Sequence, residues 1–178
     1  MLNNLRTFHY PISFINVQDK NTTNQTDFTD ISDAPKTGRL LSLDLGTKKV
    51  GIAVSDELQF TVRGVAVIKR KGWKKFLKEI IAYLAEYDAK ALVIGLPYNF
   101  DGTESEMSQE ARRIAGNFSL SIEIPVYLYD ERVSTYKARG NLWKLGLNNK
   151  QVRKRLDSEA AAIILQDFID AGKRFDKE

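Results

Sequence analysis

Four acidic residues stand where their side chains could hold a metal ion. Asp44 ends an apolar segment, Asp130 and Glu131 end another, and Asp157 leads the apolar stripe of a long helical pattern. Carboxylates gathered in a cleft repel one another, so one of them takes up a proton or a cation neutralises the group. Their hard oxygen atoms favour Mg²⁺ or Mn²⁺. With basic surroundings, such a set indicates metal-assisted hydrolysis of phosphodiester bonds.

Each acid also has a purely structural interpretation. Asp44 is a typical turn residue at the end of a strand, and Asp157 is a typical N-cap. Asp130 and Glu131 would be favoured by the dipole of a helix that follows them. Because neighbouring residues of a strand point to opposite faces, only one of these two can face Asp44 directly.

The composition excludes several other chemistries. The 178 residues include no Cys and one His, so thiol catalysis is excluded and a histidine-based triad nearly so. The length suits one domain, and no apolar run reaches the roughly 18 residues of a membrane span. The absence of a secretory signal predicts a cytoplasmic protein. A transit peptide within the N-terminal segment would instead place it in an organelle stroma.

The net charge is only +4, but the charges are unevenly distributed. Residues 132–156 contain eight basic residues and no acid, and residues 61–78 contain seven basic residues and no acid. Acid-free basic stretches around a cluster of acids fit a polyanionic substrate. The alternative is a solvated helix face.

The hydrophobic pattern predicts an α/β domain in which a mixed sheet is flanked by helices. Residues 1–38 lack an apolar period and are predicted to form a flexible extension before a domain at 39–172, with a C-terminal tail at 173–178. The predicted strands are 40–45, 50–55, 61–69, 91–96 and 125–129. The predicted helices start at Trp73, after a capping box formed by Thr103 and Glu106, at Thr135 and at Leu156, with a polar connection at 148–155.

Four segments together resemble the YqgF-type nucleases, a Holliday junction resolvase-like family. They are DLGTKKVGIAVSD at 44–56, VIGLP at 93–97, DERVST at 130–135 and DSEAAAIILQ at 157–166. The motifs occur in the family's order and cover nearly all of residues 39–170. The resemblance implies an RNase H-like fold with a five-stranded sheet, and a role in maturing the 5′ end of 16S rRNA precursors.

The resemblance also assigns roles to residues. It implies Asp44, Glu131 and Asp157 as the three catalytic, metal-binding acids, with Asp130 as the alternative to Glu131, and two Mg²⁺ or Mn²⁺ ions as cofactors. Basic and polar residues near these acids are expected to bind the nucleic acid: Lys48, Arg132, Thr135, Lys150, Arg153, Lys154 and Arg155.

Alternatives remain open at this level. Compared with the resolvases, the strand ending at Pro97 carries no acid, although branched DNA stays an alternative substrate. A non-catalytic RNA-binding module is a second alternative. A sugar-kinase or actin-like ATPase is a third, since it also uses the D-x-G-T of residues 44–47, but about 140 folded residues are too few for its two domains. Association with ribosomal particles and a monomeric or homodimeric state are further expectations.

Overall fold

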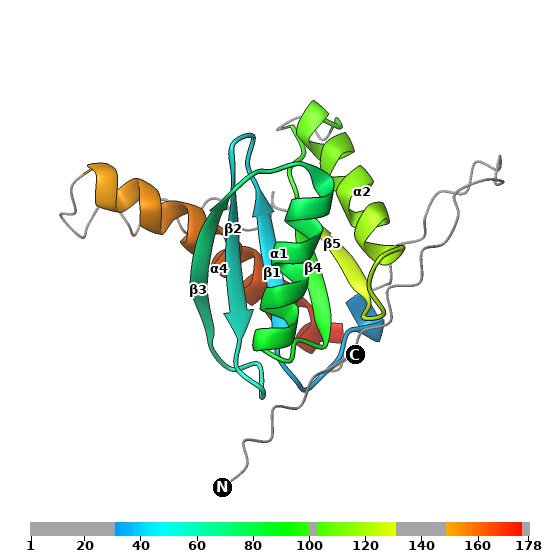
Figure 1. Cartoon of the computed structure of the whole chain (residues 1–178). Coiled ribbons are helices and arrows are strands. Elements are labelled where there is room, and N and C mark those ends of the chain that lie inside the picture. Colours follow the sequence, from blue (N-terminus) through cyan, green and yellow to red (C-terminus); the bar gives the residue numbers. More distant parts are fainter. Residues whose placement is uncertain (1–30, 100–102, 131–148, 176–178) are drawn as a thin grey trace, which may run out of the picture.

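The computed structural model describes residues 31–99, 103–130 and 149–175, without the side chains of residues 149–158 and 175. Figure 1 shows the elements in the order of the chain. They are η1 (Ile31–Asp33), β1 (Leu40–Leu45), β2 (Lys49–Ser55), β3 (Val62–Lys69), α1 (Trp73–Glu86), β4 (Ala91–Leu96), α2 (Glu106–Ser119), β5 (Val126–Asp130) and α4 (Asn149–Phe175).

The five strands form one sheet in the order β3-β2-β1-β4-β5. The first three strands are antiparallel neighbours, whereas β1, β4 and β5 are parallel to one another. The carboxyl ends of these three parallel strands therefore meet at one end of the sheet, called here the carboxyl end. Asp44 and Asp130, the last or next-to-last residues of their strands, both lie at this end.

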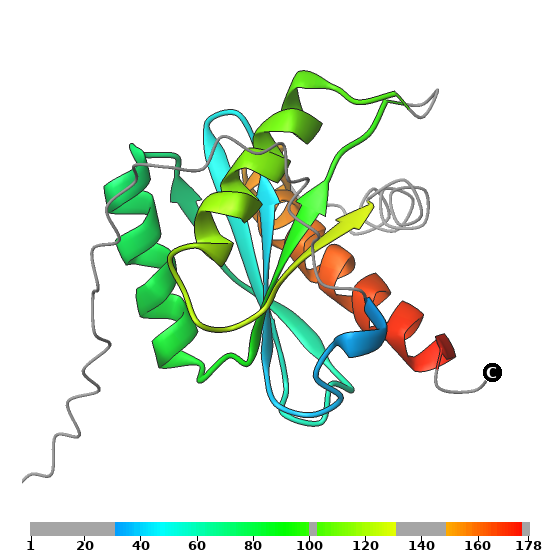
Figure 2. The ribbon, with the colours of Figure 1, turned by 90° about the vertical axis from the view of Figure 1, so that its right-hand side faces the viewer.

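Helices cover both faces of the sheet (Figures 1 and 2). On one face, Leu41 and Leu43 of β1 join the core that α1 and α2 close, where the ring of Phe118 meets Trp73 and Phe76 edge to face. On the other face, Leu40 packs against α4. Alternation along β1 thus divides its side chains between two buried layers, each large apolar side chain contributing about 1.5–3 kcal/mol to folding.

Two local predictions are wrong. Residues 149–155 of the predicted polar connection at 148–155 belong to α4, which begins at Asn149. Its Lys, Gln and Arg residues are good helix formers, and no Gly or Pro interrupts them. The cap of α2 is Ser105, not Thr103, because the Ser105 hydroxyl accepts the Ser108 amide hydrogen and the Ser108 hydroxyl accepts that of Ser105. The helix predicted from Thr135 lies outside the described residues.

Residues 31–38 pack against the opposite, amino end of the sheet, beside the end of α4 (Figure 2). Ala34 is buried, and the Tyr127 hydroxyl donates to the Asp33 carbonyl at 3.1 Å. The buried Gln59 amide donates to the carbonyls of Pro35 and Gly38 at 2.8 and 3.1 Å. The packed structure therefore includes residues before the predicted boundary at Arg39, while the predicted flexibility of residues 1–30 lies outside the described residues.

Candidate active site

Asp44 is half-buried near the end of β1, on the face that α4 covers. It shares this face with Ser42 by alternation, and the buried Ser42 hydroxyl donates to the Ala161 carbonyl of α4 at 2.7 Å. This bond fixes β1 against α4 two residues before Asp44. Asp44 is therefore placed on the α4 face of the sheet, close to a point where β1 and α4 are bonded to each other.

The turn after Asp44 is tight and presents Lys48 to solvent. The Gly46 amide donates to the Lys49 carbonyl at 2.9 Å, and a Cβ on Gly46 would lie only 2.9 Å from that oxygen. Any side chain at position 46 would force the turn open. The glycine thus allows the tight turn that carries the exposed Lys48, four residues after Asp44; its predicted contact with phosphate stays a prediction.

Asp157 lies within α4, one helical turn before Ala161. Because α4 begins at Asn149, Asp157 is an interior residue of the helix and the N-cap interpretation is excluded. Ala161 contacts Ser42, and Asp44 follows Ser42 by two residues. The side chain of Asp157 is outside the described part, so the predicted meeting of the two carboxylates stays a prediction.

Asp130 and Asp44 belong to opposite faces of the sheet. Along β5, Val126 and Leu128 belong to the core under α1 and α2. Tyr127 and Tyr129 alternate with them and pack on Phe168 of α4. Asp130 follows the parity of Leu128 and therefore lies away from the α4 face. Continued alternation favours Glu131 as the partner of Asp44, but Glu131 lies outside the described residues.

Tyr129 brings an aromatic hydroxyl to the α4 face next to the strand end. Burial raises the pKa of Tyr129, and the nearby carboxylates of Asp167, Asp130 and Asp170 act in the same direction, against Arg174. The hydroxyl therefore stays protonated at neutral pH and available as a hydrogen-bond donor. Sequence reasoning had treated this residue only as part of an apolar strand.

Arg70 is a second residue that sequence reasoning missed. Its guanidinium donates to the Gly46 carbonyl at 3.4 Å and forms an ion pair with Glu110 of α2. Hydrogen bonds from Arg113, together with the charge of Arg70, hold the pKa of Glu110 below its usual range against the effect of burial. Arg70 thereby ties the turn after Asp44 to α2. Its only sequence signal was membership of the basic stretch 61–78.

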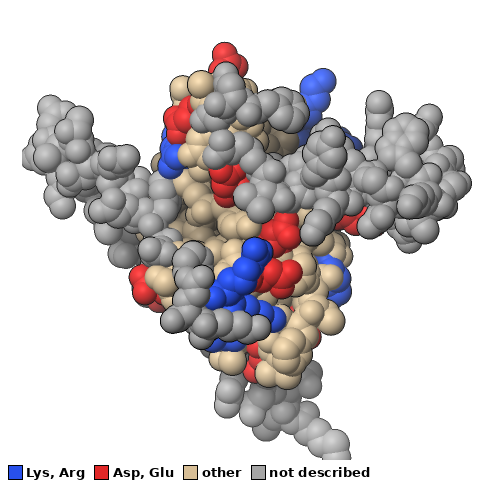
Figure 3. All heavy atoms as spheres, turned by 180° about the vertical axis from the view of Figure 1, so that it is seen from behind, with Lys and Arg blue, Asp and Glu red and all other residues tan. Residues whose placement is uncertain are grey.

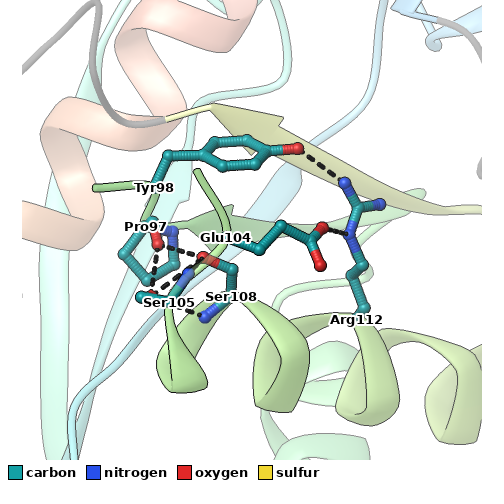
Figure 4. A network of polar contacts seen from close by, with 6 residues as sticks. All are labelled: Pro97, Tyr98, Glu104, Ser105, Ser108 and Arg112. Carbon is teal, nitrogen blue, oxygen red and sulfur yellow. Dashed lines mark hydrogen bonds and ion pairs between the residues drawn. The ribbon is translucent and has the colours of Figure 1, made fainter. Parts of the chain in front are cut away.

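A polar network fixes the chain where it leaves β4 (Figure 4). The Pro97 carbonyl accepts hydrogen bonds from the hydroxyls of Ser105, at 2.9 Å, and Ser108. Arg112 of α2 forms an ion pair with Glu104 and donates to the Tyr98 hydroxyl at 2.6 Å. This end of β4 carries no acid, as the sequence indicated, and the network gives it a structural role beside the candidate site.

Most of the other predicted site residues cannot be placed by their side chains. Arg132 and Thr135 lie outside the described residues. Lys150, Arg153, Lys154 and Arg155 lie in the first turns of α4, where only the backbone is described. Within the described ranges, no three His, Cys, Asp or Glu side chains cluster as metal ligands, and no helix is long and apolar enough to cross a membrane.

The domain is similar to known proteins over nearly its whole length. Residues 38–171 match the family described as RuvX: Holliday junction resolvase. The chain is 38% identical over 132 residues to "Putative pre-16S rRNA nuclease" of Anaeromyxobacter sp. strain Fw109-5, covering 74% of this chain and 96% of the relative. The protein of the same name from Myxococcus xanthus is 36% identical over 133 residues, covering 75% and 88%.

Among solved structures, RuvC of T. thermophilus with a Holliday junction substrate has a TM-score of 0.44 at 16% identity, covering 75% of this chain and 94% of that one. The fowlpox virus Holliday junction resolvase has a TM-score of 0.45 at 18% identity, covering 75% and 99%. The observed topology confirms the predicted α/β fold class, a mixed five-stranded sheet flanked by helices in which the three antiparallel strands come first. The match over residues 38–171 and the identity to curated relatives show that the chain belongs to the RuvX, or YqgF-type, nuclease family.

Proposed function

We propose that this nuclease is a metal-dependent endonuclease that matures the 5′ end of 16S rRNA precursors. The relatives that this chain matches over 96% and 88% of their length are named "Putative pre-16S rRNA nuclease", which supports the substrate class. The structural observation that carries the proposal is Asp44, a half-buried acid held at the carboxyl end of the sheet by the contact between Ser42 and Ala161. Association with ribosomal particles and a cytoplasmic location remain predictions that accompany this proposal.

The chemistry of the donor set suits Mg²⁺ or Mn²⁺. Asp44 offers hard carboxylate oxygens, and Glu131 and Asp157 are the acids that would complete the site. When bound, such ions activate water and neutralise charge that develops on the phosphate and the leaving oxygen. The chain's own residues would position the acids and the substrate. The Ser42 hydrogen bond orients β1 against α4, and the turn at Gly46 exposes Lys48, which would bind a phosphate of the substrate.

Cleavage of branched DNA is the second candidate, because the family description names Holliday junction resolvase. The described end of β4 argues for the RNA reading. It finishes in Leu96 and Pro97, whose carbonyl is occupied by two serine hydroxyls, and carries no acid of the kind expected in resolvases. A direct comparison of the two substrates therefore decides between the candidates.

The deciding experiment compares two strand-end acids. Purified full-length chain is assayed with Mg²⁺ and with Mn²⁺ on a pre-16S leader RNA and on a four-way DNA junction. Asp44→Asn keeps the side-chain shape but removes an anionic ligand, so cleavage should be lost while metal-free stability is kept or raised. Asp56→Asn is the matched control, because Asp56 accepts hydrogen bonds from Phe60 and Thr61 within its own turn.

The control should cleave like wild type. The proposal fails if Asp44→Asn still cleaves, or if it is inactive only because it melts early without metal. Preferential cleavage of the four-way junction would replace the RNA reading by the second candidate. Binding of RNA with no cleavage under either metal would leave only a non-catalytic module.

A further inference from the structure

The basic stretch 61–78 has no role in the site described above, apart from Arg70. In the structure its second half lies at the carboxyl end of the sheet. Lys69 ends β3 opposite Lys49 of β2, and α1 begins four residues later at Trp73. Figure 1 shows the β1–β2 turn, the end of β3 and the start of α1 on the same side of the molecule. The stretch therefore flanks the end of the sheet that carries Asp44.

Four lysines of this stretch are exposed to solvent. Arg63 lies over the Tyr87 ring, Arg70 is held by Glu110, and Lys71 pairs with Glu79. The remaining four are exposed and make no hydrogen bond or ion pair in the described part of the chain; they form the basic ridge, which consists of Lys69, Lys74, Lys75 and Lys78. Lys74, Lys75 and Lys78 have the i, i+1, i+4 spacing of one exposed helix face, opposite the buried Phe76 and Ile80.

The ridge breaks two rules that stabilise an isolated fold. Lys69 faces Lys49 across the β2–β3 ladder, where like charges oppose each other unfavourably. The first turn of α1 holds Lys74 and Lys75 and no acid, although the helix dipole favours acids there. Gly72 caps α1 without a side-chain hydrogen bond. Local rules are typically broken where another function is served.

The helix α2 gives a comparison at the same end of the sheet. It also has 14 residues, covers the same face and starts at the same end of the sheet (Figure 1). Yet its start carries the Ser105 capping box and the acid Glu106. The face covered by α4 differs too, since acidic and basic side chains adjoin there (Figure 3). Unbalanced positive charge therefore distinguishes the ridge from both regions.

We infer that the basic ridge binds the phosphate backbone of the nucleic-acid substrate outside the cleavage site, extending the Lys48 contact across β3 to α1. The inference rests on the proposed function for the identity of the polyanion. Ammonium groups on flexible stems suit sequence-independent contacts to phosphates, which release counterions and make affinity fall with salt. The ridge thus lengthens the substrate segment held by the enzyme without reading its bases.

The test removes the same charge from two places in the full-length chain. Lys74→Gln, Lys75→Gln and Lys78→Gln are combined in the ridge variant. The matched control combines Lys36→Gln, Lys90→Gln and Arg174→Gln, which lie at the amino end of the sheet or at the end of α4. Binding of a labelled pre-16S leader RNA is measured without divalent metal, at several salt concentrations, so that no cleavage intervenes.

For the ridge variant, the slope of log K against log salt should shrink by about 2 units, with affinity about 10–100-fold weaker at 0.1 M salt. The control should change the slope by less than about half a unit, and the ridge variant should melt no earlier than wild type. Equal slopes in both variants would overturn the inference and leave the ridge a solvated face.

Failure of this inference and failure of the proposed function give different results. If wild type binds and cleaves RNA while the ridge variant keeps its slope, only the inference falls. If wild type binds no RNA, both fall. The Asp44→Asn variant separates the two functions further, because it should lose cleavage but keep the full salt slope of metal-free binding.

Discussion

The two ends of the sheet hold their polar groups in different ways. At the amino end, the Gln59 amide and the Tyr127 hydroxyl donate to carbonyls of residues 33–38, and Lys173 donates to the Gln59 carbonyl at 2.8 Å. At the carboxyl end, Asp44 is half-buried and the basic ridge faces solvent. Hydrogen bonds at the amino end therefore tie residues 33–38 to the sheet, whereas the carboxyl end combines paired groups, such as Arg70 with Glu110, with the exposed lysines of the ridge.

Asp44, near the end of β1, and Asp56, directly after β2, also differ in what holds them. Desolvation would raise the pKa of Asp56, but hydrogen bonds from Phe60 and Thr61 outweigh it and lower that pKa. Asp56 is thus committed to its own turn. Asp44 instead belongs to β1 and shares the α4 face with Ser42. The position of an acid at a strand end does not by itself show whether the acid serves structure or binding; its hydrogen-bond partners must also be known.

The largest expected effect tests the carboxyl end. Glu131→Gln should lower the cleavage rate by more than about 100-fold, since even residues around metal ligands contribute about 10–100-fold. Asp130→Asn should reduce the cleavage rate much less. Asp130 lies on the same face of β5 as Leu128, which packs under α1 and α2 and faces away from α4. Single-turnover cleavage of the leader RNA measures both, and the reverse ranking would exchange the roles of the two acids.

The next effect tests the amino end by truncation. Deletion of residues 1–30 should leave stability unchanged, whereas deletion of 1–38 should cost about 2–4 kcal/mol. The longer deletion removes the acceptors of the buried Gln59 amide and of Tyr127, and it exposes the surface that Ala34 covers. Urea unfolding measures the difference. Equal stability of the two truncated chains would show that residues 31–38 contribute nothing to the fold.

How far the sequence could predict this molecule depends on the range of the interactions. Alternation and helical spacing are local, so the strand beginning at Leu40 and the helix at Trp73 were predicted to the residue. The four motifs identified the family and hence the sheet. Contacts such as Arg70 with Glu110, or Gln59 with Pro35, join distant segments through side chains that look ordinary in sequence. These could not be predicted without the fold.

A smaller effect compares the starts of α1 and α2 at the carboxyl end. Ser105→Ala should cost about 1 kcal/mol by removing the cap of α2, with RNA binding unchanged. Gly72→Asp should raise stability by about 0.5 kcal/mol, because its carboxylate can accept hydrogen bonds from the first amides of α1 and interacts favourably with the helix dipole. A Cβ at position 72 would meet no atom within 4 Å, so the substitution fits. The same acid should weaken RNA binding beside the basic ridge. Thermal melting measures the stability of both variants, and titration with labelled RNA measures their affinity. Unchanged RNA affinity in Gly72→Asp would show that the RNA does not pass close to the start of α1.

The smallest effect concerns the pH dependence of the Arg70–Glu110 link. The pKa of Glu110 is lower in the folded chain than its ordinary value, chiefly because Arg113 and Arg70 stabilise the carboxylate. Such a group adds stability above its unfolded pKa of about 4.3, and this stability is lost as the pH falls through the lower folded pKa. Glu110→Gln should therefore be less stable than wild type at pH 7, and the difference should narrow below about pH 4.

Urea unfolding of both proteins at several pH values measures this narrowing. Glu123→Gln is the matched control, because Glu123 is exposed and makes no ion pair in the described part of the chain. Its free energy of unfolding, plotted against pH, should run parallel to that of wild type. A Glu110→Gln curve that also stays parallel would show that Arg70 holds the Gly46 turn without help from α2. The turn after Asp44 would then be tied to the end of β3 but not to α2, whereas the amino end keeps its hydrogen bonds between distant segments.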